Sequence, residues 1–384
     1  MAKKNFQMSL EALTPIFIGS GEKLLKKEYI CVPSNSEEVK ILVPNLSKLY
    51  LFFENLGIGN VFEEYLASSK TRNRNLYDLL LEYKISLKDI SECVSYNYSV
   101  VPTGGVGNTE IELRDVDTFI KNAFGRPYIP GASLKGMLRT ALLSLKVTKN
   151  PNDYLSIKKS IERTVKNGET KQKGRRYLKS ENLDMESEAF HTLERNKKNK
   201  NNAVNSSFRG LIVSDSEPLE LSDLTLGQKI DISLKGKEKP LPIFREMLKP
   251  GVKVHFTITL DEDILGFSMD EIFEALNHFH RLNDDYFYSR FQRRNIGKDI
   301  VYLGGGVGFS SKTVVDALFP KKDEGLAVKN RIFQETLGKK YSEHHHEEDV
   351  NLKIAPHMCK CTRYNYKLYN VGIGQLSIIK QERI

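Results

Sequence analysis

The most informative stretch of the chain is Arg126-Pro-Tyr-Ile-Pro-Gly-Ala-Ser-Leu-Lys-Gly-Met-Leu-Arg-Thr-Ala-Leu-Leu-Ser-Leu145. Its two prolines fix φ and keep the residues before them extended. A glycine turn at Gly131 then leads into a helix, for which Ser133 is the expected N-cap. Apolar residues recur with helical spacing and predict one core-facing stripe: Leu134, Met137, Leu138, Ala141, Leu142 and Leu145.

The first turn of this helix is basic. Lys135 and Arg139 lie four residues apart, so they share one helical face. A helix N-terminus carries free amide groups and partial positive charge, and both favour an anion such as phosphate. The segment alone leaves two interpretations open, an ordinary capped amphipathic helix and an anion-binding helix start.

Composition and charge indicate a folded protein with a polyanionic partner. The 384 residues suffice for two domains, and 40% of them are hydrophobic. The net charge is +9, and nine basic but only two acidic residues lie between Lys158 and Lys179. This pattern favours nucleic-acid contact, although a solvated loop would show it too. No apolar run is long enough for a membrane helix or a signal peptide, so we expect a cytoplasmic protein.

Cysteines and histidines do not form a recognisable metal motif. His357, Cys359 and Cys361 form His-x-Cys-x-Cys, whereas structural zinc sites generally use a two-residue gap and a second such pair. We interpret the run from His344 to Asp349 as a solvent-exposed polar loop that could bind a metal only adventitiously. We therefore expect neither a metal nor a cofactor.

Patterns along the chain predict an α+β fold in which antiparallel sheets pack against helices. Residues 1–149 form the first predicted domain. Apolar and polar residues alternate over 5–13 and predict a half-buried strand, and Asn45 is the expected N-cap at the start of a helical insertion at about 45–94. Residues 150–205 are rich in lysine and asparagine, so we expect a basic, partly mobile inserted arm. Residues 206–384 form the second predicted domain, which contains a glycine-rich loop.

That loop reads Gly304-Gly-Gly-Val-Gly-Phe-Ser-Ser-Lys-Thr313. It lacks the glycine that a nucleotide-binding P-loop carries before its Lys-Thr pair, so nucleotide hydrolysis is not predicted. Its glycines still allow close backbone approach, and Lys312 lies at a helix start where a phosphate can bind. The long helix predicted over 269–294 ends with basic and aromatic residues.

Three motifs, in this order, resemble those of the RAMP superfamily, the repeat-associated RNA-binding subunits of CRISPR systems. They are Pro15-Ile-Phe-Ile-Gly-Ser-Gly21, Tyr128-Ile-Pro-Gly-Ala-Ser-Leu-Lys-Gly-Met-Leu-Arg-Thr140 and the loop at 304–313. The length of the chain and the form of the late loop are most similar to the fifth Csm subunit of type III-A effector complexes.

The resemblance implies two ferredoxin-like (RRM-like) domains and a non-catalytic subunit that binds crRNA and caps its 3′ end. It also implies a repeating backbone Csm subunit and a small helical Csm subunit as partners, and a role in crRNA maturation and assembly during antiviral defence. Recruitment of host trimming nucleases stays open. Two alternatives stay open as well: a RAMP endonuclease that processes pre-crRNA, or a subunit that caps the crRNA 5′ handle.

The side chains that RAMP nucleases use are missing from the corresponding places. Some of these enzymes use a histidine of the N-terminal domain, and the first histidine here is His191. The repeating backbone subunit uses an aspartate in the loop after its first strand, and the first aspartate here is Asp78. We therefore predict no catalytic residue, and an endonuclease would have to recruit His191 or His255.

The predicted RNA contacts come from the three motifs, the basic arm and the basic helix end. Single-stranded RNA is generally held by cationic grooves that follow its phosphates. The predicted residues are Gly19, Gly21, Gly131, Ser133, Lys135, Arg139, Lys171, Lys173, Arg175, Arg176, Arg293, Arg294, Gly304, Gly305, Gly306, Gly308, Lys312 and Thr313.

Overall fold

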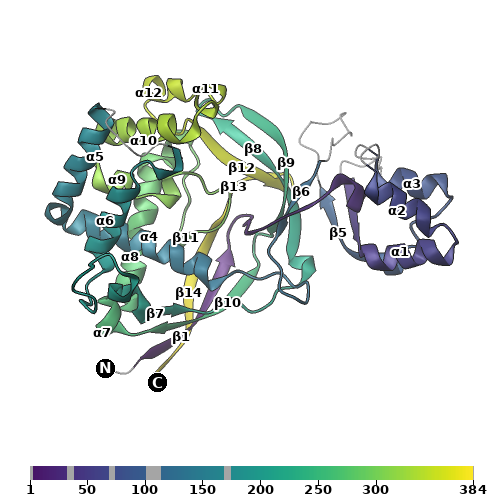
Figure 1. The fold of residues 1–384 in the computed structure, drawn as a ribbon, viewed down its shortest axis with the longest axis horizontal. Coiled ribbons are helices and arrows are strands. Elements are labelled where there is room, and N and C mark those ends of the chain that lie inside the picture. Colours follow the sequence, from purple (N-terminus) through teal and green to yellow (C-terminus); the bar gives the residue numbers. More distant parts are fainter. Residues whose placement is uncertain (1–2, 33–38, 69–73, 101–113, 168–173, 384) are drawn as a thin grey trace.

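The structure is a computed structural model of the chain and describes residues 3–32, 39–68, 74–100, 114–167 and 174–383. Two sheets form the centre of the molecule, with most helices gathered at one end and a small helical lobe at the other (Figure 1). This arrangement confirms the predicted mixed α+β class with antiparallel sheets. None of the described helices is long and apolar enough to cross a membrane.

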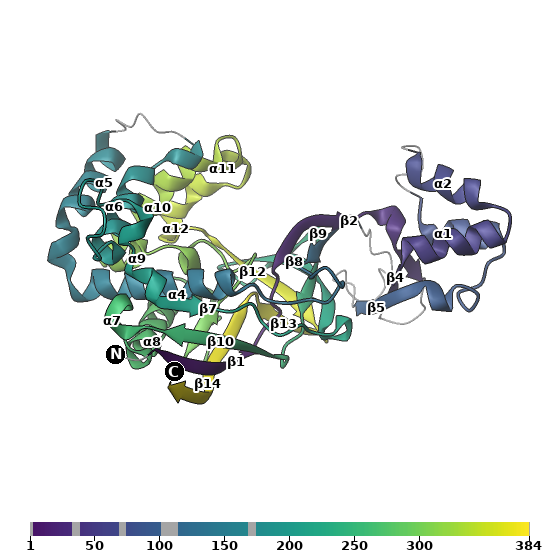
Figure 2. The ribbon, with the colours of Figure 1, turned by 60° about the horizontal axis from the view of Figure 1, so that its bottom comes forward.

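The first sheet joins the two ends of the sequence. Its order is β11 (Ile300–Tyr302), β14 (Ile373–Arg383), β1 (Lys4–Ala12), β10 (Lys253–Leu260) and β7 (Leu211–Val213), and every pair is antiparallel. The N- and C-terminal strands therefore lie side by side (Figure 2). Every second residue of β1 is buried, as its alternating sequence predicted: Phe6, Met8, Leu10 and Ala12.

Four of these strands and two helices follow the β-α-β-β-α-β order of a ferredoxin-like unit. Along the chain, β1 is followed by α4 (Gly131–Lys149), β7, β10, α8 (Met269–Tyr286) and β14. In space the strands are ordered β14-β1-β10-β7, and α4 packs against α8. Both predicted domains contribute to this one unit, and the strand pairings do not confirm a second ferredoxin-like domain.

The second sheet has six strands and supports the glycine-rich loop. Its order is β13 (Lys367–Asn370), β12 (Met358–Tyr364), β8 (Leu224–Ser233), β9 (Glu238–Leu248), β6 (Val116–Phe119) and β2 (Gly19–Leu24). Among the described strands of this sheet, β6 and β9 pair in parallel and the other neighbours are antiparallel.

The predicted helical insertion forms the small lobe. Three helices, α1 (Leu46–Asn55), α2 (Gly59–Ala67) and α3 (Leu76–Glu82), accompany a sheet of β3 (Ile30–Val32), β4 (Val39–Pro44) and β5 (Val94–Val100). Asn45 caps α1 by accepting a hydrogen bond from the Lys48 amide at 3.0 Å, as predicted. The helices share a core with Ile30 and Leu42, separate from the main core that Ile41 and Tyr98 join.

The segment predicted as an arm contains two helices in its described part. Helices α5 (Leu155–Asn167) and α6 (Lys179–Phe190) both pack against the main core. In α5, Ile157, Ile161 and Val165 form an apolar stripe with a spacing of four residues, which the lysine-rich composition obscures. The predicted contacts Lys171 and Lys173 lie outside the described residues, as does the side chain of Arg175.

The remaining helices are short except one. They are α7 (Glu262–Leu265), α9 (Val315–Leu318), α10 (Lys322–Leu337), α11 (Lys340–Glu343) and α12 (Asp349–Leu352). Helix α10 contacts α5, α9 and α12, so the C-terminal helices and the segment predicted as an arm form one helical layer (Figure 1).

Candidate nucleic-acid interface

The N-terminus of α4 is capped by a distant side chain. The helix begins at Gly131, so Ser133, the expected N-cap, lies inside it, and that prediction was wrong. The Gly131 amide instead donates a hydrogen bond to Asp215 Oδ1 at 2.8 Å. A Cβ on Gly131 would lie 2.3 Å from the Ser214 carbonyl oxygen, so only glycine fits here. The chain's own carboxylate therefore provides the anion at this helix start.

Lys135 and Arg139 share one face of α4, as predicted, and both have partners within the chain. Lys135 Nζ donates to the Leu211 carbonyl oxygen at 2.5 Å, and burial together with Arg139 lowers the Lys135 pKa. Arg139 forms an ion pair with Glu186 of α6, and its guanidinium carbon lies 5.2 Å from the centre of the Phe208 ring. These contacts brace α4 against β7 and α6, and a contact with RNA stays a prediction.

The glycine-rich loop meets the segment that carries the first motif. The Gly305 amide donates to the Phe17 carbonyl oxygen at 2.8 Å, and Phe17 forms a parallel β-bridge with Gly304. A Cβ on Gly304 would lie 1.9 Å from the same oxygen, and its φ of +77° also favours glycine. Two motifs from opposite ends of the sequence thus form a single backbone crossing.

Basic side chains gather beside this crossing. The guanidinium carbon of Arg245, on β9, lies 4.8 Å from the centre of the Phe17 ring. A Cβ on Gly306 would lie 3.3 Å from an Arg245 terminal nitrogen, so this arginine reaches the glycine-rich loop. Burial and then the charge of Arg245 lower the pKa of Lys312.

Two further cations belong to the same group. Burial lowers the pKa of Lys360 on β12, and the charges of Lys229, Arg245 and Lys312 lower it further, partly offset by Asp231. We call Lys229, Arg245, Lys312 and Lys360 the cation cluster. Strands β8, β9 and β12 are neighbours in the six-stranded sheet, so their pairing brings three of these side chains together.

The cation cluster has few acidic partners. Lys229 Nζ lies 3.5 Å from Asp231 Oδ1, and Arg245 Nε lies 3.5 Å from Asp117 Oδ2. Within the described part of the chain, neither Lys312 nor Lys360 forms an ion pair. Three of the four side chains are partly buried, and Lys312 is exposed. Mutually repelling cations at such a position favour a bound anion, because an anion removes the repulsion.

Comparison with known proteins relates this arrangement to a family. The sequence model of the RAMP superfamily matches residues 9–297. The chain belongs to the RAMP superfamily. It is 30% identical to the "CRISPR system Cms protein Csm5" of Streptococcus thermophilus, over 98% of this chain and 93% of that protein. It is 28% identical to the protein of the same name from Mycobacterium tuberculosis (strain H37Rv), over 99% of both chains.

Two solved structures share the fold of this RAMP chain. One is described as the cryo-EM structure of a Csm-crRNA-target RNA ternary complex in a type III-A CRISPR-Cas system, and its matching chain has a TM-score of 0.63. The match covers 97% of this chain and 100% of that one. The other is a crystal structure of T. onnurineus Csm5, with a TM-score of 0.54 over 81% of this chain and 92% of that one. Both are 20% identical in sequence, so they show the shared fold alone.

Two further predicted contacts of the RAMP chain, Arg293 and Arg294, have partners within the chain. Arg293 donates to Asn370 Oδ1 at 2.7 Å and to the Leu368 carbonyl at 3.0 Å, so it holds β13. Arg294 pairs with Asp285 at 3.0 Å. The other described members are an exposed 3₁₀-helix residue, two glycines of β2, a loop glycine with a φ of +91° and a buried hydroxyl without a hydrogen-bond partner among the described residues: Arg176, Gly19, Gly21, Gly308 and Thr313.

The two histidines considered for catalysis lie in different settings. Nδ1 of His191, at the end of α6, lies 3.0 Å from the Lys200 carbonyl oxygen and 3.3 Å from Ser187 Oγ. These contacts suit a structural role for His191. His255 is partly buried and lies in β10, where its backbone pairs with Ser9 of β1.

The run from His344 to Asp349 was predicted as an exposed loop, and this was wrong for two of its residues. His346 is 9% exposed and Asp349 is fully buried. Phe333 of α10 packs against His346, and His357 contacts both residues from the other side of the run in sequence, so composition alone could not reveal the burial. Cys359 and Cys361 are buried in β12, with each Sγ close to Asn370 Oδ1.

Sequence reasoning found Lys312 and missed the other three members of the cation cluster. Lys229, Arg245 and Lys360 each lie in a strand whose local pattern gives no sign of a shared site. Their proximity depends on which strands pair, and no local signal identifies β12 as the neighbour of β8.

Proposed function

We propose that this chain is the Csm5-type subunit of a type III-A CRISPR effector complex and that it binds crRNA without cleaving it. Its RAMP membership and its similarity to Csm5 proteins over nearly the whole chain support the place in the complex. The observation that carries the RNA-binding proposal is the cation cluster beside the glycine-rich loop. An RNA phosphate there would neutralise Lys312 and Lys360, and the glycines would let the RNA backbone approach.

We further propose that the subunit caps the 3′ part of the crRNA, next to the repeating backbone Csm subunit and the small helical Csm subunit. The family resemblance supports this position. The absence of cleavage is supported by the sequence before His191, which contains no histidine, and by the hydrogen bonds that engage the His191 ring. A general acid or base must be free to reach the scissile phosphate.

A salt titration of RNA binding tests the cation cluster. The double variant Lys312→Ala with Lys360→Ala should weaken crRNA binding for every sequence, and the slope of log K against log salt concentration should become shallower by about one for each phosphate that is no longer neutralised. The matched control is Lys48→Ala with Lys88→Ala, which removes two exposed lysines from the small helical lobe. An unchanged slope in the Lys312/Lys360 variant would contradict the proposed contacts.

A second pair of variants tests whether α4 contacts RNA or only braces the fold. If Lys135 and Arg139 bind phosphates, reversing both charges should flatten the salt dependence. If their only role is to hold the fold together through Leu211 and Glu186, the same variant should lower the thermal unfolding midpoint. RNA binding by the protein that remains folded should then keep the same salt dependence. Comparing the two measurements decides between these roles.

Two assays test the position and the lack of catalysis. In the assembled complex, a crosslink from the cation cluster should reach the 3′ part of the crRNA, and a crosslink to the 5′ handle would support the alternative cap.

Purified chain without divalent metal should not cleave pre-crRNA. Cleavage that disappears in His191→Ala or His255→Ala would instead establish the endonuclease alternative.

A further inference from the structure

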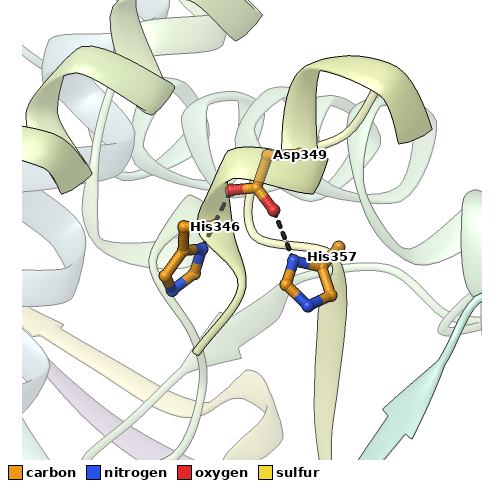
Figure 3. Close-up of side chains that lie close together, drawn as sticks. All are labelled: His346, Asp349 and His357. Atoms are coloured by element: carbon orange, nitrogen blue, oxygen red, sulfur yellow. Dashed lines mark hydrogen bonds and ion pairs between the residues drawn. The ribbon is translucent and has the colours of Figure 1, made fainter. Parts of the chain in front are cut away.

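Two imidazoles and one carboxylate form a compact cluster (Figure 3), and the turn and the helix α12 that carry two of them contact α10. His346 lies in a 3₁₀ turn at His346–Glu348, Asp349 is the first residue of α12, and His357 directly precedes β12. One candidate ligand atom of each side chain lies within 4.8 Å of those of the other two. The cluster has no part in the contacts of the cation cluster described above.

Both imidazoles present Nδ1 to the same carboxylate. Nδ1 of His346 lies 2.9 Å from one Asp349 oxygen, and Nδ1 of His357 lies 2.5 Å from the other (Figure 3). The two imidazole side chains are only 11% and 12% exposed. A buried carboxylate needs a compensating positive charge, and either a protonated imidazole or a metal cation can supply it.

The surroundings hold the His346 ring in this orientation. Its centre lies 4.8 Å from that of Phe333 and 6.0 Å from that of Tyr341. His344 comes from the same run, with its ring centre 6.1 Å from that of His346. Packing therefore fixes one imidazole toward the carboxylate before any ligand arrives, as expected of a preformed site.

We propose that His346, Asp349 and His357 bind one divalent transition-metal ion of the zinc type. Two imidazole nitrogens and one carboxylate oxygen are a ligand set that zinc uses at distances of about 2.0–2.2 Å, with a fourth position left for water or another ligand. The ion takes the place of the two hydrogen bonds to Asp349. Each imidazole then keeps its single proton on Nε2 and coordinates through Nδ1, and any extra proton on an imidazole is released.

The consequence of this site is structural. The ion would connect the turn at His346–Glu348 and α12 to His357, the residue just before β12. Strand β12 also carries Lys360 of the cation cluster. A metal that binds only the folded chain stabilises it. The proposal does not depend on RNA binding, because metal content and unfolding are measured without RNA.

Metal analysis of the full-length chain tests the proposal. The chain is purified through a tag without histidine, stripped with a chelator and titrated with zinc, and bound zinc is counted by elemental analysis. We expect one ion per chain and a lower unfolding midpoint after stripping. His346→Gln and His357→Gln should each weaken zinc binding by at least about tenfold. The matched control is His345→Gln, which removes a 68% exposed histidine of the same run and should keep the ion.

A cysteine variant studied by absorption spectroscopy distinguishes metal coordination by residue 357 from a role in packing alone. With cobalt in place of zinc, His357→Cys should retain the ion and add a thiolate-to-metal absorption band, because cysteine is itself a ligand. This readout decides the proposal if His346→Gln fails to fold. Wild-type chain that retains no zinc, or equal losses in His345→Gln and His357→Gln, would overturn the proposal.

Discussion

The carboxylate of Glu246 links three separate segments of the chain. It is fully buried in β9, and one oxygen accepts hydrogen bonds from the hydroxyls of Tyr96 at 2.7 Å and Tyr98 at 2.9 Å. The other oxygen accepts from the Phe119 amide at 2.8 Å and from Lys121 at 2.5 Å. The two tyrosines belong to β5, so this one side chain attaches the small lobe to the six-stranded sheet.

Replacing Glu246 with glutamine should destabilise the protein by about 3–5 kcal/mol. The variant leaves Lys121 without its charged partner and puts an amide donor opposite hydroxyl donors, and breaking a buried pair on one side is costly. Urea unfolding measures the change. Glu188→Gln is the control, because Glu188 forms an exposed ion pair with Lys200 and should change stability by less than about 1 kcal/mol. Equal effects of the two variants would contradict the role of Glu246.

A second single-residue prediction concerns the backbone crossing. Gly304→Ala should lower the free energy of unfolding by more than about 2 kcal/mol, because the positive φ disfavours alanine and the new Cβ would collide with the Phe17 carbonyl. Gly308→Ala separates the two causes. Its φ is +91°, but a Cβ there would meet no atom within 4 Å, so only the backbone strain remains. The prediction fails if both alanines cost the same, as measured by thermal unfolding.

Helix α8 carries a buried pair with a pH-dependent effect on stability. His280 is 7% exposed, its Nδ1 lies 3.0 Å from the Tyr302 hydroxyl, and its Nε2 lies 3.9 Å from Asp284. Burial lowers the pKa of His280 and raises that of Asp284, so the folded state favours the neutral form of each. The unfolded chain therefore takes up a proton at His280 at a higher pH than the folded chain does.

Stability should consequently fall as the pH drops below about 6.5, the ordinary pKa of histidine. Thermal unfolding between pH 7.5 and 5.5 should show a steeper fall for the wild type than for His280→Gln, which cannot take up this proton. The difference between the curves reports the titration of His280 together with its effect on the pKa of Asp284, which the variant also removes. Parallel curves would show that its burial has no such effect.

The assembly of the main body depends on β14. This strand pairs with β1, and β1 in turn pairs with β10, so the ferredoxin-like unit is complete only when both ends of the sequence meet (Figure 2). The same unit carries α4 and α8. Long-range pairing of this kind makes folding of the main body a single cooperative event.

Deleting residues 373–384 should therefore abolish the cooperative unfolding transition of the main body. The deletion removes the partner of β1 together with the buried side chains of Ile373 and Leu376, and it leaves β1 with an unpaired edge. Deleting only residues 381–384 is the control, because pairing between Met8–Ala12 and the start of β14 remains. Circular dichroism and amide hydrogen exchange in β1 measure the outcome. Full protection of β1 in the longer deletion would contradict the prediction.

Local patterns in the sequence were enough to predict several elements. Alternation in β1, the Asn45 cap of α1 and the apolar stripe of α4 depend on neighbours a few residues away, and the structure confirms all three. The same holds for the glycine-rich loop. Its glycines predicted that another backbone could approach closely, and in the structure the backbone of Phe17 does so. Such features follow from local sterics and periodicity.

The other features of the candidate site depend on contacts between segments that are far apart in the sequence. The Asp215 cap replaced the expected Ser133 cap, Glu186 became the partner of Arg139, and both come from segments far along the chain. The cation cluster and the buried pair of His346 and Asp349 likewise depend on which strands and helices become neighbours. The motifs in the sequence alone were enough to indicate a RAMP chain and to predict that it binds RNA. Which side chains lie next to one another depends on the tertiary structure, because burial, like-charge repulsion and hydrogen bonds between distant residues arise only when the sheets assemble.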